Sequence, residues 1–262
     1  LTALLEQYGF GYDVIPFDQQ AFIAEPWDWE VLPCPDFLSS NRFKRLLQHQ
    51  RQGWELALYR LKNNYLMNNN GARNRAFELG RRRADWVLPW DGNCFLTPSA
   101  WHQLRQAVEA QPQVHYFHVP MQRIASNDQL LDPGFVPDPR DEPQLIMASV
   151  ATQQFNPAYP YGRRPKVEMF WHLGLAGPWD GWCDEPWDQP RRPMLDPQPS
   201  CPPAGWVARL HSGVRDPSPA NAPTVLSQQR RYSARNLAIK ASVNQALRGD
   251  QHQALSMFEC FW

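Results

Sequence analysis

The sequence has no apolar run that approaches the roughly 18 residues of a membrane span, and it shows no signal peptide. Cysteine is scarce: five in 262 residues, at positions 34, 94, 183, 201 and 260. Their odd number and the lack of a Cys-x-x-Cys pair argue against a zinc knuckle or a dense disulfide framework and favour a reducing compartment. We therefore expect a cytoplasmic protein without a transmembrane segment.

Net charge is also absent, because 26 Lys and Arg residues balance 26 Asp and Glu residues. Such a chain has no global field that would attract nucleic acid, so nucleic acid is not an expected partner. There is no internal repeat and no glycine-rich phosphate loop. Tryptophan (12) and proline (26) are abundant. Proline indicates long loops, while tryptophan suits sugar faces but is more often simply core.

Hydrophobic periodicity predicts strands alternating with helices. The expected strands cover residues 12–17, 85–88, 114–121, 145–150 and 206–210. The expected helices cover residues 1–9, 41–61, 72–83, 101–110, 165–173 and 228–247. Ser39 or Ser40 is expected to cap the helix at 41–61. Residues 63–71 are expected to form a turn-rich break. This alternation predicts an α/β fold with a mostly parallel sheet flanked by helices and with long loops after strand ends.

The expected strand 85–88 is followed by Asp91-Gly92-Asn93. In open α/β sheets, ligands bind just outside the carboxyl ends of the strands. A carboxylate and an amide at such a place offer hard oxygens to a divalent cation or to a sugar. The alternative is a polar cap on a strand, and the surrounding sequence has to decide between the two.

Residues 70–76 (Asn-Gly-Ala-Arg-Asn-Arg-Ala), then Gly80, then residues 84–93 resemble the central signature of GT-A fold nucleotide-sugar glycosyltransferases, family 2-like. In that family a helix with a similar sequence precedes a strand that ends in a D-x-D motif. The resemblance implies a GT-A fold and a divalent cation, Mn²⁺ or Mg²⁺, on the donor diphosphate. Carried over residue by residue, it places Asn70, Gly71, Arg73, Asn74 and Asp91 on the nucleotide-sugar and Asp91 and Asn93 on the metal.

Asn93 departs from the family pattern, in which an acid ends the motif. A neutral amide binds Mg²⁺ or Mn²⁺ more weakly than a carboxylate does. His211 follows the expected strand 206–210 and could compensate, because imidazole is a good Mn²⁺ ligand. A lone histidine is more often structural, so the metal is the least secure part of the resemblance.

The acceptor side of the family is represented by the glycine turn at residues 173–179 and the acidic pair Asp184-Glu185. An inverting transfer needs a carboxylate that takes the proton of the attacking hydroxyl. Asp184 or Glu185 is the candidate base, with Asp180 and Asp188 as rivals, although acids in a loop are often merely solvated. Trp179, Trp182 and Trp187 form either a sugar-stacking wall or loop packing. The basic residues in 161–166 suit phosphate or an anionic acceptor, or simply a helix entry.

We therefore expect one GT-A-like domain over residues 1–262, with a nucleotide-sugar half (1–113), an acceptor half (114–262) and a first strand upstream of Leu1, which suggests a fragment. The expected function is transfer of a sugar from a UDP- or GDP-sugar to a glycan or other hydroxyl acceptor, with inversion. Two alternatives stay open. One is a non-catalytic homologue that binds nucleotide-sugar or glycan, which Asn93 favours, and the other is a nucleotidyltransferase.

Overall fold

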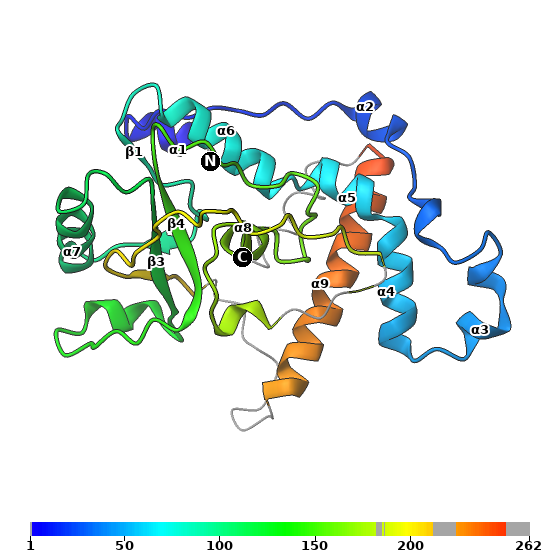
Figure 1. Ribbon diagram of the computed structural model, residues 1–262. Helices are drawn as coiled ribbons and strands as arrows, with labels where there is room; N and C mark the ends of the chain where they lie inside the picture. Colours follow the sequence, from blue (N-terminus) through cyan, green and yellow to red (C-terminus); the bar gives the residue numbers. More distant parts are fainter. Residues whose placement is uncertain (1, 182–184, 186, 212–223, 250–262) are drawn as a thin grey trace.

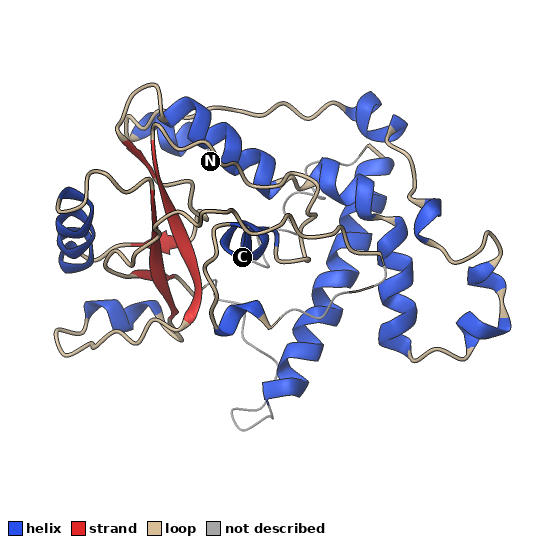
Figure 2. Ribbon diagram, in the orientation of Figure 1, coloured by secondary structure: helices blue, strands red, loops and turns tan. Residues whose placement is uncertain are grey.

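The computed structural model describes residues 2–181, 185, 187–211 and 224–249. Within them the chain forms an α/β fold around one five-stranded sheet (Figures 1 and 2). The strands lie in the order β1-β4-β3-β5-β2. Their bounds are Trp86–Val87 (β1), Cys94–Phe95 (β2), Tyr116–Arg123 (β3), Asp141–Ala148 (β4) and Val207–Arg209 (β5).

The sheet is mixed. Strand β3 pairs with β5 in parallel, with Met121 opposite Val207, whereas the β1–β4, β3–β4 and β2–β5 pairs are antiparallel. The predicted predominance of parallel pairs is therefore not found among the described strands. The reason lies in the connections: β3 returns directly to β4 through a loop with one short 3₁₀ helix, η3 (Asn127–Leu131), and neighbours joined without a crossover helix run antiparallel.

Helices cover both faces of the sheet, which explains why β4 is buried throughout from Pro143 to Ala148. On one face, Leu104 and Val108 of α7 (Pro98–Glu109) pack on Phe117 and Ile146. On the other face lie α6 (Asn69–Gly80) and α8 (Pro165–His172). Helix α7 begins at Pro98 after the cap Thr97, and Pro165 begins α8 as its position in the sequence predicts.

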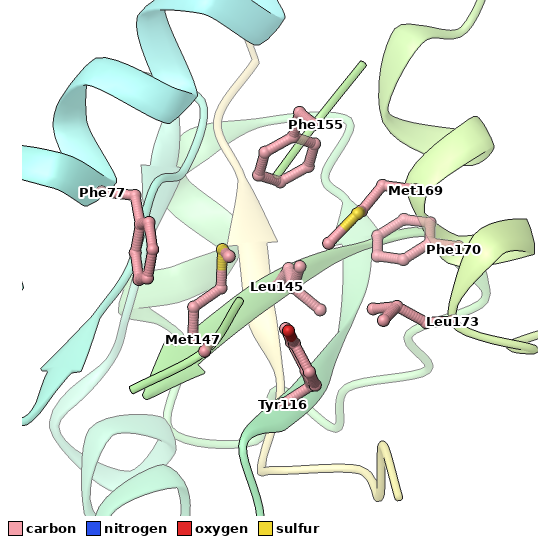
Figure 3. Packing of buried hydrophobic residues seen from close by; sticks show 9 residues of the cluster. Phe77, Tyr116, Leu145, Met147, Phe155, Met169, Phe170 and Leu173 are labelled. Carbon is pink, nitrogen blue, oxygen red and sulfur yellow. The ribbon is translucent and has the colours of Figure 1, made fainter. Parts of the chain in front are cut away.

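Figure 3 shows the core between the sheet and the layer formed by α6 and α8. Leu145 and Met147 of β4 point into this core, while Ile146 between them faces α7. The helices contribute Phe77 from α6 and Phe170 from α8. This two-residue alternation is the expected result of strand geometry, and it fixes the register of β4 against both layers.

A helical region lies beside the sheet and contains α3 (Asn41–Lys44), α4 (Gln48–Leu58), α5 (Arg60–Leu66) and α9 (Thr224–Leu247) (Figure 1). Helix α9 packs on α4 and α5. The prediction of one helix over residues 41–61 is wrong, because Leu47 is extended and its N–H is bound by the Gln50 side chain at 3.0 Å. The predicted break at 63–71 shrinks to two residues between α5 and α6. Ser40 caps α3 as predicted, accepting the Phe43 N–H at 3.1 Å.

The N-terminal part runs from α1 (Thr2–Gln7) across α6 to α2 (Gln19–Ala24) (Figure 1). Residues 12–17 were predicted as a strand, but they pair with none of the described strands, and Val14 and Ile15 are exposed. The buried ammonium of Lys62 donates to three carbonyls at the end of α2 and just beyond it, of which Glu25 O is 2.6 Å away.

The remaining short helices are η1 (Trp29–Val31), η2 (Phe37–Ser39) and η4 (Pro178–Asp180). None of the helices in the described ranges is long and apolar enough to cross a membrane.

Candidate functional site

Strands β1 and β2 lie at opposite edges of the sheet. The segment that connects them contains the Asp91-Gly92-Asn93 turn. The indole N–H of Trp90 fixes its start by donating to Leu145 O at 2.9 Å. After the turn, Cys94 pairs with Arg209 of β5, and the Asn93 carbonyl accepts the Leu210 N–H at 2.9 Å. The turn therefore lies beside the end of β5, one residue from His211.

Asp91 is the centre of a buried network of charges. One carboxylate oxygen accepts a hydrogen bond from the Arg73 guanidinium of α6 at 2.5 Å. The other accepts from the Gln144 amide at 3.2 Å and from the Lys166 ammonium at 3.3 Å. The side chains of Arg73, Asp91 and Lys166 are only 8%, 7% and 4% exposed. The Asp91 carboxylate thus ties its own turn to two helices, α6 and α8, and to strand β4.

The charges decide the protonation state of this carboxylate. Burial by itself would raise the pKa of Asp91, but the positive charges of Lys166 and Arg73, together with hydrogen bonds from Arg73 and Gln144, hold that pKa well below its usual range. Asp91 is therefore an anion at every physiological pH. Burial, with a smaller contribution from the negative charge of Asp91, raises the pKa of the neighbouring Cys94 thiol to about 11.

Lys166 also contacts a second acid, because its ammonium lies 3.3 Å from the Glu142 carboxylate at the start of β4. Glu142 is 29% exposed, so this side of the network reaches solvent. Lys166 sits in the first turn of α8, where a positive charge is unfavourable beside the positive end of the helix dipole. Asp91 and Glu142 compensate that charge.

The other candidate nucleotide-binding residues are held by backbone. Asn70 is fully buried and donates to Asn156 O and Pro165 O at 2.8 and 2.9 Å. Asn74 exchanges two hydrogen bonds with the backbone of Phe155, at 2.8 and 2.9 Å. The Gly71 N–H binds the capping side chain of Asn68 at 2.6 Å. These contacts fix α6, and a contact with a nucleotide stays a prediction for each of the three residues.

The donor set Asp91, Asn93 and His211 fits a divalent cation poorly. Both oxygens of Asp91 already bind the cationic groups of Arg73 and Lys166, which would repel an added metal ion. The Asn93 side-chain oxygen and nitrogen are buried and have no hydrogen-bond partner in the described part of the chain, but a neutral amide adds no negative charge to offset this repulsion. Nowhere in the described ranges do three His, Cys, Asp or Glu side chains form a group suited to a metal. The Mn²⁺ or Mg²⁺ site therefore stays a prediction that these contacts do not favour.

A second feature is a cavity of about 520 Å³. Its described lining consists of Trp171, Asp180, Glu185, Asp188, Gln189, Pro190 and Arg191. The candidate base Glu185 is therefore on the wall of a space large enough for a small ligand. The other candidate, Asp184, lies outside the described residues.

The acids of this cavity differ in their partners. Asp180 pairs with Arg191 at 2.8 Å. Asp188 accepts from Arg163 at 2.7 Å and from the Glu185 N–H at 2.7 Å. No hydrogen bond or ion pair to the Glu185 carboxylate occurs among the described residues. Burial raises the pKa of Glu185, and the Asp188 charge adds to this effect, while Arg163 and His49 oppose it.

The basic segment at residues 161–166 connects the two features. Arg163 binds Asp188 on the cavity wall, while Lys166 binds Asp91. Between them, Arg164 donates to Trp179 O at 2.8 Å and to Gly181 O at 3.1 Å. Arg164 has a left-handed backbone, with φ of 49°, which costs free energy in a residue other than glycine and is most common at functional sites.

The predicted acceptor-side motifs serve packing in the described residues. Trp179 packs on the core with its ring centre 6.4 Å from that of Phe170, and Trp187 packs on Trp54 at 4.5 Å. Gly174, with φ of +76°, ends α8, where the Leu175 N–H binds Phe170 O at 2.8 Å in a Schellman motif. Trp182 lies outside the described residues.

Sequence reasoning missed Gln144 and Glu142 as members of the Asp91 network. Gln144 is fully buried within the apolar run of β4. A polar residue inside such a run requires a hydrogen-bond partner, and that requirement is the signal that could have identified it. Glu142 carries no comparable signal, because an acid at a strand end is ordinary.

The sequence matches no protein-family model, and the comparisons with curated proteins and with solved structures likewise give no match. The function therefore has to be argued from the site itself.

Proposed function

We propose that the protein is a glycosyltransferase of GT-A type, with a nucleoside diphosphate sugar as its donor. One observation carries the proposal: Arg73 on the helix that resembles the family's nucleotide-side helix and Asp91 in the D-x-D-like turn bind each other directly, at 2.5 Å. The two parts of the resemblance, 18 residues apart in the sequence, thus meet at one place.

The segment 161–166 connects this donor region to the acceptor region. Through Lys166 and Arg163 it contacts both the Asp91 network and the cavity with Glu185. In the proposed reaction, the acceptor hydroxyl gives its proton to the Glu185 carboxylate, and its oxygen bonds to the anomeric carbon of the donor. The bond from that carbon to the β-phosphate oxygen breaks, and the nucleoside diphosphate leaves with the electron pair.

Glu185 suits the role of base because its pKa is raised, and a general base works best when its pKa approaches the working pH. It also lacks a described partner that would hold its carboxylate. The described sheet does not support the GT-A assignment, because one parallel pair among its four strand pairs is fewer than that fold implies. The assignment rests on the resemblance of residues 70–93 and on the contact between Arg73 and Asp91. The donor is proposed to be a UDP- or GDP-sugar and the acceptor a glycan or another hydroxyl compound.

A second candidate is a non-catalytic protein that binds nucleotide-sugar or glycan. The neutral Asn93 favours it, since the metal-binding acid of the D-x-D motif is missing. The two candidates differ in whether the bound donor is turned over.

Turnover of UDP- and GDP-sugars, with and without Mn²⁺, tests the proposal. In an active protein, Glu185→Gln is expected to lower kcat by about 100-fold, the range for loss of a general base, and to leave donor affinity unchanged. Glu109→Gln is the matched control, since its carboxylate is 62% exposed on α7. Donor binding without turnover would support the non-catalytic candidate. No binding of any nucleotide-sugar would refute the proposed glycosyltransferase and leave only the glycan-binding form of the second candidate.

A further inference from the structure

We propose that Lys166 and Arg73 bind the diphosphate of the donor, providing with side chains the positive charge that a divalent cation provides in D-x-D enzymes. This inference rests on the proposed function and adds the groups that recognise the ligand. It starts from a mismatch: the turn has one acid instead of two, and this acid already contacts two cationic side chains. Asp91 is then the residue that positions these cations.

The network has unused hydrogen-bonding capacity. The guanidinium of Arg73 binds Asn70 and Asp91 through its terminal nitrogens, but its Nε–H is buried and has no acceptor among the described residues. The Arg73 side chain is only 8% exposed. Buried donors in folded proteins nearly always have a partner. The Asn93 amide has an unpartnered N–H donor beside the same turn. Both donors suit the oxygens of a phosphate.

Lys166 has a partner that a ligand can replace. Asp91 is 7% exposed, whereas Glu142, the other acid on the ammonium, is 29% exposed. A phosphate oxygen that displaces Glu142 would keep the Lys166 ammonium paired with an anion. The Glu142 carboxylate thus occupies the position where the inference places an anion.

Asp91 alone leaves one of the two positive charges of the network uncompensated, and Glu142 compensates it in the free protein. Arg73 and Lys166 carry two positive charges, and Asp91 and Glu142 carry two negative charges, so the free network is neutral. When the diphosphate replaces Glu142, the two cations face the ligand with Asp91 behind them. A charge-assisted hydrogen bond to phosphate is short and about twice as strong as a neutral one.

The test measures binding of UDP and GDP by thermal shift and calorimetry in EDTA. The wild-type protein is expected to bind one of them without metal. Lys166→Met should weaken this binding by about tenfold, as expected for loss of one charge-assisted contact, and Lys166→Arg should restore most of it. Lys44→Met is the matched control, because Lys44 is exposed on α3 and should have no effect.

Glu142→Gln keeps the test decisive if Lys166→Met does not fold. Removing a competing anion from a partly exposed pair should tighten diphosphate binding about threefold, within the range for such pairs. Binding that requires Mn²⁺ and does not respond to Glu142→Gln would overturn the inference and leave the proposed function intact. If no nucleotide binds with or without Mn²⁺, the proposed function fails and the inference fails with it.

Discussion

The Arg73 guanidinium and the Asp91 carboxylate form an ion pair of 2.5 Å in which both side chains are more than nine-tenths buried. Such a pair costs desolvation of both charges, so its presence is weak evidence of net stabilisation. The loss of one partner is different, because it leaves the other charge buried without compensation. The pair therefore joins the stability of the fold to the chemistry of the site.

Replacement of Asp91 by Ala is expected to destabilise the protein by about 3–5 kcal/mol, the cost of breaking a buried ion pair. Both Arg73 and Lys166 would then remain buried without their shared anion. Urea unfolding measures the loss. Asp138→Ala is the control, because Asp138 is 64% exposed in its pair with Arg140, and its loss should cost less than about 1 kcal/mol. Equal losses in the two variants would contradict the role of burial.

The pKa of Asp91 predicts a loss of stability in acid. Because the folded-state pKa lies below the ordinary value of 3.8, the unfolded chain takes up a proton first as the pH falls. The contribution of Asp91 is therefore complete above about pH 5 and decreases progressively below pH 4. Unfolding experiments between pH 7 and pH 2.5 should show a shallower acid decline for Asp91→Asn than for the wild type. Parallel declines would show that other carboxylates dominate.

The raised pKa of Glu185 predicts the acid limb of the pH–rate profile. If Glu185 is the base of the proposed transfer, kcat/KM falls when it becomes protonated, with an apparent pKa above the ordinary 4.5. Asp188→Asn removes an adjacent negative charge that contributes to the shift, so it should move this limb to lower pH. A limb at the ordinary value that does not respond to Asp188→Asn would rule out Glu185 as the titrating group.

Gly174→Ala is expected to destabilise the protein by about 1–2 kcal/mol, the cost of a left-handed backbone in a residue with a Cβ atom. Its φ is +76°, and an added Cβ would lie 2.5 Å from the Gln198 side chain. Gly11→Ala is a suitable control, because no atom lies within 4 Å of a Cβ there and its φ is not in the left-handed region. Thermal or urea unfolding compares the two variants.

The thiols of Cys94 and Cys201 are expected to resist alkylation in the native protein. Burial raises their pKa values to about 11 and about 12, so at pH 8 only about one molecule in a thousand or fewer carries a thiolate. Timed iodoacetamide labelling with peptide mass spectrometry should modify both residues only after addition of denaturant. Rapid labelling of either residue in the native state would show that its environment is open.

Local signals in the sequence predicted local structure well. Ser40 was expected as a possible cap and Pro165 as a helix start, and both occupy these positions. Such signals work because a cap or a proline acts on the backbone within one turn. The core strands around Phe117 and Ile146 were also recognised, because their apolar runs are long.

The same local signals could not predict whether neighbouring strands pair in parallel or antiparallel. A buried antiparallel strand that is covered on both faces reads as a continuous apolar run, just as a parallel strand does, and β4 around Leu145 is such a case. Residues 12–17 have a strand-like composition, but no neighbouring strand in the described sheet accepts them. The apolar side chain of Leu47 fits the helical spacing of the sequence, but its backbone is extended and separates α3 from α4.

The sequence predicted several residues of the candidate site but not the contacts that these residues make. Asp91 and Arg73 were recognised as members of one region, and they are in contact. Lys166 was recognised only as part of a basic segment, and its contact with Asp91 spans 75 residues of sequence. Long-range pairs of this kind depend on the packing of α6 against α8, which periodicity does not encode.

The pairing of β2 with β5 has a consequence for synthesis of the chain. Cys94, beside the Asp91 turn, pairs with Arg209, and α4 packs against α9 at the far end of the described chain. A ribosome adds about 5–20 residues each second, so the Asp91 turn must wait several seconds for its neighbouring strand. During that interval Asp91 and Arg73 are already made, whereas Gln144 and Lys166 are still to be added, so the charge network is incomplete. Its assembly is therefore a late step, and premature release of the nascent chain before β5 would leave Asp91 without its completed surroundings.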